Sequence, residues 1–256
     1  MRFDGQKIAI TGGAGDLGGR IARRLMAAGA KVSVLDRVAP SAKGAESILC
    51  DLADPASLEA AAQTLAGQDW DVLVNLAGVQ YFGPVEGEKP DQLARTFAVN
   101  LVAPIRLTQA VLPRMRARRR GRIVNIGSIF GSINFAHFAT YSSSKAGVHG
   151  FSQALRRELK GSGVDVVYVA PRAVKTTFNS AKVLEFAYLT KMTMDDPDAV
   201  AARIVEAIGG RRPEVYLGFP EALFVRLNAI LPGLVDRALA SADRRVAGLF
   251  PTTEAH

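Results

Sequence analysis

Residues 7–19 read Lys-Ile-Ala-Ile-Thr-Gly-Gly-Ala-Gly-Asp-Leu-Gly-Gly, and this stretch decides the fold. The run Lys7 to Thr11 predicts a short buried strand, and glycines follow it directly. Leu17, Ile21 and Leu25 then recur at helical spacing as far as Ala28-Gly29, where the helix is expected to end. The chain therefore opens with a strand, a glycine-rich turn and a helix.

The same alternation of strands and helices continues along the chain, and the strands are continuous apolar runs, typical of a parallel sheet covered on both faces. There is no repeat, linker or break in composition. We predict one α/β domain over residues 1–256, a Rossmann-like doubly wound parallel sheet of about seven strands with an apolar helical C-terminal extension at about 220–256. Further strands are expected at Lys31–Asp36, Ser47–Cys50, Asp71–Asn75, Arg122–Ile126, Val164–Ala170 and Glu214–Leu217, and further helices at Pro55–Ala66, Asp91–Arg116, Tyr141–Lys160 and Asp198–Ile208.

The composition is that of a globular chain, with 48% hydrophobic and 22% charged residues among 256, which excludes a disordered, collagen-like or coiled-coil protein. One cysteine, Cys50, excludes an internal disulfide framework, and three histidines leave little for a zinc site, so no metal is expected. Met1 leads almost directly into the first strand without a signal peptide, and Ile123 to Ser144 is too polar to span a membrane. We expect a cytoplasmic protein.

The formal charge of +8 comes from one segment. Residues 92–157 contain eleven lysines and arginines and no acidic residue, whereas the rest of the chain has 32 − 11 = 21 basic and 24 acidic residues. The densest part, Arg114 to Arg122, could attract nucleic acid, anionic lipid or an acidic protein. It has no interleaved aromatic residues, which favours a solvated helix end over a binding patch, and no nucleic-acid partner is expected.

The glycine turn places helix N–H groups where a pyrophosphate can bind, and Asp36 ends the next strand. Its carboxylate can accept hydrogen bonds from adenosine ribose hydroxyls and would repel a 2′-phosphate. This favours NAD over NADP as the cofactor, although Arg37 next door could bind the phosphate instead.

Tyr141 and Lys145 are four residues apart, so on a helix their side chains share a face. A free tyrosine has a pKa of about 10, and lowering it toward 7 requires about 4 kcal/mol. One cation at about 4 Å supplies an energy of that order at an effective dielectric near 20. Lys145 is therefore predicted to make Tyr141 a working acid or base, with Ser128 placed to hydrogen-bond a substrate oxygen.

These features recur in one order along the chain. Over residues 5 to 220 they resemble the short-chain dehydrogenase/reductase family. The matching pieces are the glycine turn Thr11 to Gly18, Asp36, Asp51 in Cys50-Asp51-Leu52, Asn75-Leu76-Ala77-Gly78, Asn100, Ser128, Tyr141 with Lys145, and Pro171 followed by Thr176. The resemblance implies that Tyr141 is the catalytic acid or base and that Lys145 lowers its pKa and holds the nicotinamide ribose. It also implies that Ser128 orients the substrate oxygen and that Asn100 supports a water that relays protons.

The resemblance further implies a cofactor site and a homodimer or homotetramer. The implied cofactor residues are Gly12, Gly15, Asp16, Leu17, Gly18, Asp36, Arg37, Asp51, Leu52, Asn75, Ala77, Gly78, Tyr141, Lys145, Pro171, Val174 and Thr176. Two positions depart from the family pattern: Asp16 replaces the middle glycine of the turn, and Arg172 follows Pro171 where glycine is usual. The Asp16 carboxylate would weaken pyrophosphate binding unless it points outward or caps the helix. The side chain of Arg172 would crowd the nicotinamide end, or could instead pair with a cofactor phosphate or an anionic substrate.

Apolar residues gather on the substrate side, in the expected lid Thr176 to Met194 and in the loop that carries Ile129, Phe130, Ile133, Phe135 and Phe138. They indicate either a bulky apolar substrate or simple packing of the lid. The segment Ala222 to Leu231 is apolar nearly all round, and we favour burial or an oligomer contact over a membrane surface for it.

We predict an NAD(H)-dependent oxidoreductase that interconverts a secondary alcohol and a ketone on a bulky, mainly apolar substrate. The alternatives are an NADPH-dependent ketoreductase for carrier-protein-bound acyl thioesters, docked at Arg114–Arg122, and a non-catalytic cofactor-binding interaction protein.

Overall fold

Seven parallel strands form one sheet in a computed structural model that describes residues 2–250, in the order β3-β2-β1-β4-β5-β6-β7. The strand order reverses between β1 and β4, and in a doubly wound sheet the cleft lies at the carboxyl ends of the two strands that flank this point. The predicted doubly wound parallel sheet is confirmed. The strands are β1 Lys7–Thr11, β2 Lys31–Asp36, β3 Glu46–Leu49, β4 Val72–Asn75, β5 Gly121–Ile126, β6 Val164–Ala170 and β7 Glu214–Tyr216.

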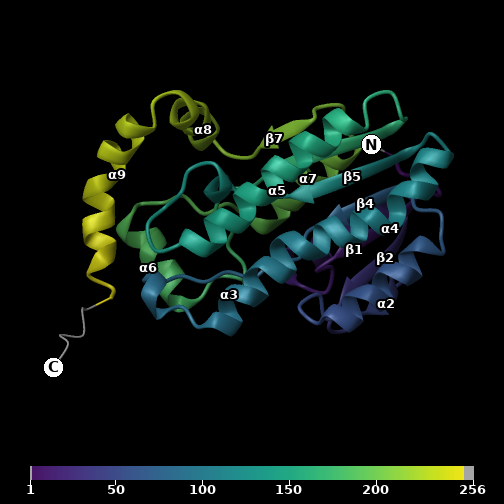
Figure 1. Cartoon of the computed structure of the whole chain (residues 1–256), viewed down its shortest axis with the longest axis horizontal. Helices are drawn as coiled ribbons and strands as arrows, with labels where there is room; N and C mark the ends of the chain where they lie inside the picture. The colour runs from purple at the N-terminus through teal and green to yellow at the C-terminus, as the bar shows by residue number, and fades with distance from the viewer. Residues whose placement is uncertain (1, 251–256) are drawn as a thin grey trace.

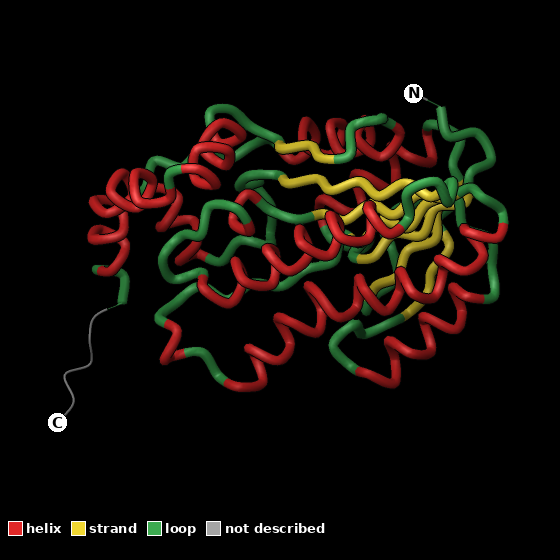
Figure 2. The backbone as a smooth tube through the Cα atoms, turned by 45° about the horizontal axis from the view of Figure 1, so that its top comes forward, coloured by secondary structure: helices red, strands yellow, loops and turns green. Residues whose placement is uncertain are grey.

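Helices cover both faces of the sheet (Figures 1 and 2). α1 and α7 pack together on one face, and α2, α4 and the C-terminal half of α5 pack on the other. The helices are α1 Asp16–Ala27, α2 Pro55–Ala66, α3 Pro90–Phe97, α4 Ala103–Ala117, α5 Ala139–Glu158, α6 Ala181–Leu189, α7 Pro197–Gly209, α8 Glu221–Ile230 and α9 Pro232–Ala247, with single turns η1 Val85–Gly87 and η3 Ile129–Gly131.

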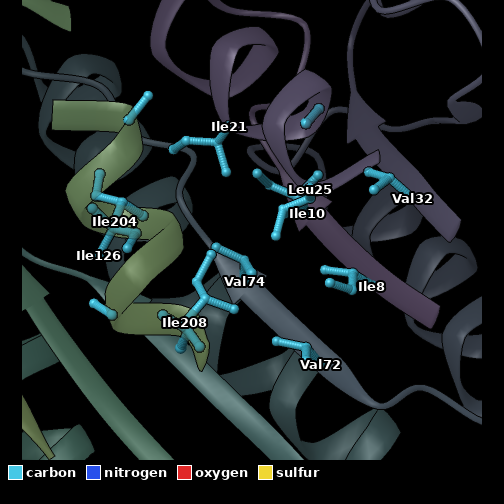
Figure 3. Packing of buried hydrophobic residues seen from close by; sticks show 14 of the residues in the cluster. Ile8, Ile10, Ile21, Leu25, Val32, Val72, Val74, Ile126, Ile204 and Ile208 are labelled. Atoms are coloured by element: carbon cyan, nitrogen blue, oxygen red, sulfur yellow. The ribbon is translucent and has the colours of Figure 1, made fainter. Parts of the chain in front are cut away.

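Successive side chains of a strand point to opposite faces of the sheet, so the sheet has a separate hydrophobic core on each face. Ile8 and Ile10 of β1 belong to the cluster with α1 and α7, and Figure 3 shows Ile10 beside Leu25 of α1, whereas Ala9 between them faces α2 and α4. Apolar residues occupy both sets of positions because both faces are covered, which explains the unbroken apolar runs in the sequence.

The predicted continuous helix over 91–116 is interrupted. α3 ends at Phe97, a π-helical turn, η2, covers Ala98–Val102, and α4 follows from Ala103. The buried side chain of Asn100 lies in this turn and makes three hydrogen bonds to groups outside it. Side-chain periodicity does not reveal such an insertion, because the helical direction is kept on both sides of the turn.

The arginines between 114 and 122 lie at the amino ends of the strands and are held by the chain itself. Arg114 pairs with Asp69 at 3.2 Å, and Arg122 pairs with Asp165 at 2.6 Å and donates to the carbonyl of Gly210 at 2.9 Å. These bonds agree with a structural helix end. Ser128, at the opposite end of β5, is six residues from Arg122, a separation of about 20 Å along the strand.

α8 and α9 lie at the end of the molecule that also contains α6, and α9 contacts α6 (Figure 1). The favoured burial of Ala222–Leu231 within the chain is contradicted, because Leu223 is 53% exposed and Ile230 is 76% exposed. Residues 251–256 of the predicted C-terminal extension lie outside the described part. Among residues 2–250 no helix has both the length and the apolar character needed to cross a bilayer.

Candidate active site

The glycine turn is locked between β1 and β4. The hydroxyl of Thr11 accepts hydrogen bonds from the backbone N–H groups of Leu76 and Ala77, both at 3.0 Å. Gly12 has φ +73°, and a Cβ on it would lie 2.9 Å from the Cα of Ala77. A Cβ on Gly18 would lie 2.1 Å from the carbonyl oxygen of Gly12. Neither position has room for a side chain, so the start of α1 packs directly on the turn.

Asp36 is fixed at the carboxyl end of β2 by two backbone groups. Its Oδ2 accepts from the N–H of Ala14 at 3.0 Å, and its Oδ1 accepts from the N–H of Arg37 at 2.7 Å. Each carboxylate oxygen keeps a further lone pair, so the side chain can still accept hydrogen bonds from a ligand.

Asp16 is the first residue of α1, and Gly15 is the N-cap. The Asp16 carboxylate bonds to Arg20 at 2.8 Å, and Arg20 also pairs with Asp198 of α7. Asp16 therefore does not cap the helix. It belongs to a partly exposed charge network whose arginine offsets the negative charge near the turn.

A cavity of about 450 Å³ runs from the glycine turn to the lid. No side chain caps the N-terminus of α1, and a Cβ on Gly15 would have the Gly12 carbonyl at 3.4 Å as its one neighbour within 4 Å. Free helix N–H groups beside an open glycine are the chemistry that a pyrophosphate requires, so the residues present fit a dinucleotide. Residues 2–250 contain no group of three or more metal-ligating side chains. The predicted cofactor residues that line the cavity are Gly12, Gly15, Asp16, Leu17, Gly18, Asp36, Arg37, Asp51, Leu52, Ala77, Gly78, Tyr141, Lys145, Pro171, Val174 and Thr176.

Ser128, Tyr141 and Lys145 meet in this cavity from two elements. Ser128 follows β5, and the other two lie one turn apart on α5. The Ser128 side chain lies near enough to the Tyr141 phenol to lower its pKa. The Lys145 Nζ lies 5.9 Å from the centre of the Tyr141 ring and donates to the Ile126 carbonyl at 3.1 Å.

Burial acts on both titrating groups in the direction that disfavours charge. It raises the pKa of Tyr141 to about 12, against a smaller lowering by the Ser128 hydrogen bond. It lowers the pKa of Lys145 to about 8. Burial therefore opposes the lowering of the Tyr141 pKa that was expected from Lys145.

Two asparagines assigned to the site lie behind it. The Asn75 Nδ2 donates to Asn125 at 2.8 Å and joins β4 to β5, so this side chain points away from the cavity in which it was predicted. The Asn100 Nδ2 donates to the Val79 carbonyl and to the Ser144 hydroxyl, at 2.8 and 2.9 Å, and its Oδ1 accepts from the Val79 N–H. Asn100 thus orders the backbone after β4 and ties it to α5. A Cβ on Gly78 would lie 3.4 Å from the Asn100 Oδ1 and 3.5 Å from the Lys145 Nζ, so both side chains end close to that glycine.

Arg172 is engaged by the chain and was wrongly expected to pair with a cofactor phosphate or an anionic substrate. Its guanidinium makes a two-point ion pair with Asp195, at 2.9 and 2.7 Å, and donates to the Phe219 carbonyl at 3.3 Å. Val174 forms a β-bridge with Asp195. Arg172 therefore fastens the segment after β6 to the end of the lid.

Aromatic side chains enclose the substrate end of the cavity. Phe130, Phe138 and Phe186 pack edge to face, with ring centres 4.9 and 5.1 Å from that of Phe138. Ile133 was expected to line this end but packs with Val225 of α8 and Val235 of α9. Positions that the sequence missed are Val38, Val99 and Arg95 along the cavity, which carry no local motif, and the Ile126 carbonyl, which is set by the fold.

Comparisons with known proteins agree with this architecture. The sequence profile of the short chain dehydrogenase family matches residues 6–185. The chain is 31% identical to dehydrogenase/reductase SDR family member 7B of Bos taurus, with 93% of this chain and 81% of that protein covered. It is 33% identical to 3-oxoacyl-(acyl-carrier-protein) reductase FabG of Salmonella typhimurium strain LT2, with 71% and 78% covered. The solved structure of a gluconate 5-dehydrogenase from Burkholderia cenocepacia J2315, in complex with NADP and tartrate, superposes with a TM-score of 0.77 at 25% identity, with 87% and 97% covered. A nucleotide cleft, the Ser128–Tyr141–Lys145 cluster and these matches together show that the chain belongs to the short-chain dehydrogenase/reductase family of oxidoreductases.

Proposed function

We propose that this oxidoreductase interconverts a secondary alcohol and a ketone on a bulky, mainly apolar substrate, with Tyr141 as acid or base and NAD(H) as cofactor. The observation that carries the proposal is one continuous cavity, lined by the glycine turn and Asp36 at one end and by Ser128, Tyr141 and Lys145 at the other.

The cofactor would lie along the start of α1, with its adenosine ribose at Asp36 and its nicotinamide near Val174 and Thr176. When bound, it supplies the hydride acceptor or donor. In reduction, the Ser128 hydroxyl holds the carbonyl oxygen and the Tyr141 phenol, protonated at neutral pH, donates its proton to that oxygen. In oxidation the Tyr141 oxygen would act as a phenolate that takes the proton of the alcohol, and the Lys145 ammonium would stabilise the negative charge of that phenolate before the transfer.

The preference for NAD rests on Asp36. Two backbone N–H groups hold its carboxylate in place beside the glycine turn, so it cannot easily turn aside for a 2′-phosphate. Arg37 is exposed and lines the same part of the cavity, which keeps NADP as the competing assignment. The Burkholderia cenocepacia relative was solved with NADP, so the two cofactors must be compared directly.

An apolar substrate is supported by the side chains opposite Tyr141. Phe130, Phe138, Val183 and Phe186 line the cavity there and are buried, and Met192 adds an adaptable wall. Such a surface offers few partners to a hydroxyl-rich sugar acid, so we expect long-chain or polycyclic ketones to be reduced faster than gluconate-like substrates.

The deciding experiment is a screen of apolar and polar alcohols and ketones with NAD(H) and NADP(H), in wild type and Tyr141→Phe. We expect turnover of apolar substrates that the phenylalanine variant loses by at least about 100-fold, with NADH affinity kept, because the phenol transfers the proton. Full activity in Tyr141→Phe would remove the proposed mechanism.

Reduction of carrier-bound acyl thioesters remains the second candidate, because of the similarity to the FabG reductase. The docking site predicted for the carrier at Arg114–Arg122 is not supported, since these arginines lie at the opposite end of the sheet from Tyr141. Charge reversal at Arg116 should accordingly leave the KM for a carrier-bound ketone unchanged. We also expect a homodimer or homotetramer, to be measured by analytical ultracentrifugation.

A further inference from the structure

The C-terminal helices expose apolar side chains that nothing in the described chain covers. Of fourteen large apolar residues exposed within residues 2–250, six lie between positions 219 and 234. We name this set the C-terminal apolar face. It consists of Phe219, Leu223, Phe224, Ile230, Leu231 and Leu234, which are between 43% and 78% exposed.

The C-terminal apolar face is exposed because the opposite side of α8 is attached to the rest of the protein. Val225 is buried against the core, and Asn228 donates to the Ser132 carbonyl at 2.8 Å, so this side of the helix is fixed to the loop after β5. Leu223, Ile230 and Leu231 recur at spacings of seven and eight residues on the outer side. An ordinary surface helix presents mainly polar side chains to water, whereas the exposed side of α8 consists largely of apolar ones.

Four arginines lie on the same two helices as the C-terminal apolar face, and one of them, Arg245, donates to the Leu189 carbonyl of α6 at 3.3 Å. Arg237, Arg244 and Arg245 are exposed on α9, and Arg226 is exposed on α8. None of the four forms an ion pair in the described part of the chain, and over positions 219–250 the sequence has four basic and three acidic residues. One of those acids, Asp243, is partly buried, and burial raises its pKa.

We propose that the C-terminal apolar face and these arginines bind the surface of a membrane that contains anionic phospholipid. Apolar side chains of such a helix enter the boundary between headgroups and acyl chains, while arginines contact lipid phosphates. A second copy of this chain fits less well. In a twofold contact the patch meets its own copy, so the four arginines of one copy would have only the three acidic residues of positions 219–250 in the other copy as ion-pair partners. The proposal goes beyond the proposed oxidoreductase activity and does not depend on it.

The test is sedimentation of the full chain with vesicles of phosphatidylcholine, alone or mixed with phosphatidylglycerol. The wild type should bind the mixed vesicles more tightly. The double variant Leu223→Glu/Ile230→Glu should lose at least about tenfold in affinity, since its apolar contact is replaced by two carboxylates. The matched control is Leu49→Glu/Val85→Glu, which makes the same change at residues that are 68% and 64% exposed elsewhere, and it should bind like the wild type.

A second pair of variants tests the proposal independently, in case the double variant Leu223→Glu/Ile230→Glu fails to fold. Arg237→Ala/Arg244→Ala should weaken binding to mixed vesicles by about fivefold per arginine at low salt, whereas Arg211→Ala/Arg212→Ala should not. Absence of wild-type binding overturns the proposal, as do equal losses in test and control variants. It is also overturned if the wild type ignores vesicles and the glutamate variant dissociates a wild-type oligomer, which would assign the face to a second copy.

Discussion

Replacing Lys145 by methionine should make the protein more stable at neutral pH while removing its oxidation activity. The Nζ of Lys145 is buried, its chain partner is the carbonyl of Ile126 at 3.1 Å, and burial lowers its pKa to about 8. A lysine in the unfolded chain titrates near 10.5. The folded state therefore binds the proton less tightly than the unfolded state, and folding at pH 7 includes the cost of burying an ammonium.

The size of this cost follows from the difference between the two pKa values. A difference of 10.5 − 8 = 2.5 units corresponds to about 3 kcal/mol of destabilisation below pH 8. Between pH 8 and 10.5 the folded lysine loses its proton first, so stability increases with pH and the cost at pH 9.5 falls to about 1 kcal/mol. Loss of the hydrogen bond to Ile126 offsets about 1 kcal/mol of the gain in Lys145→Met at either pH.

Urea unfolding of both proteins at pH 7.0 and 9.5, without added cofactor, measures this effect. The stability advantage of Lys145→Met should shrink by about 2 kcal/mol between the two pH values, because other titrating groups are common to both proteins. An advantage that does not change with pH, or that grows, would show that the buried ammonium is not what destabilises the fold. Near-ultraviolet circular dichroism of both proteins serves as the control for intact tertiary packing.

Three further outcomes follow from individual contacts. Asp36→Ala should raise kcat/KM for NADP relative to NAD by at least about tenfold in steady-state assays, since the repelling carboxylate is gone. Tyr168→Phe removes the 3.4 Å hydrogen bond from the buried phenol to the Ser128 carbonyl, and kcat should fall severalfold while the KM for the cofactor stays constant. Gly18→Ala places a Cβ 2.1 Å from the Gly12 carbonyl, so calorimetric titration should detect no dinucleotide binding and urea unfolding should show a loss of more than about 1 kcal/mol.

The local sequence contains enough information for the sheet and for most of the cleft. Each strand is an apolar run bounded by turn residues, and each cleft residue follows such a run, so chain order alone places Gly12, Asp36 and Ser128 at one edge of a parallel sheet. The alternation of side chains between the two faces of a strand also predicts the direction of the Asn75 side chain. Leu73 packs on the α4 side of the sheet, and Asn75, two residues later, must share its direction, away from the cofactor.

The remaining features depend on partners that are distant in the sequence. Arg172 and Asp195 are 23 residues apart, and neither belongs to a sequence motif that indicates their ion pair. The π-helical turn at Asn100 exists because Val79 and Ser144 accept and donate around one amide. The exposure of Leu223 depends on which side of α8 packs against the core. A helix that is apolar nearly all round does not specify that side in its sequence.

The pKa values of the catalytic pair suggest how the site moves a proton without taking one from water. Burial raises the pKa of the Tyr141 phenol and lowers that of the Lys145 amine, so it favours an arrangement in which the two groups carry one titratable proton between them. That arrangement can exist as phenol with amine or as phenolate with ammonium, and the second form is stabilised by attraction between its charges inside a medium of low dielectric. A positive charge brought beside the phenol favours the phenolate, whereas a carbonyl oxygen that gains negative charge recovers the proton. Burial, which works against each charged form separately, therefore permits proton transfer in either direction once a substrate oxygen lies between Ser128 and Tyr141.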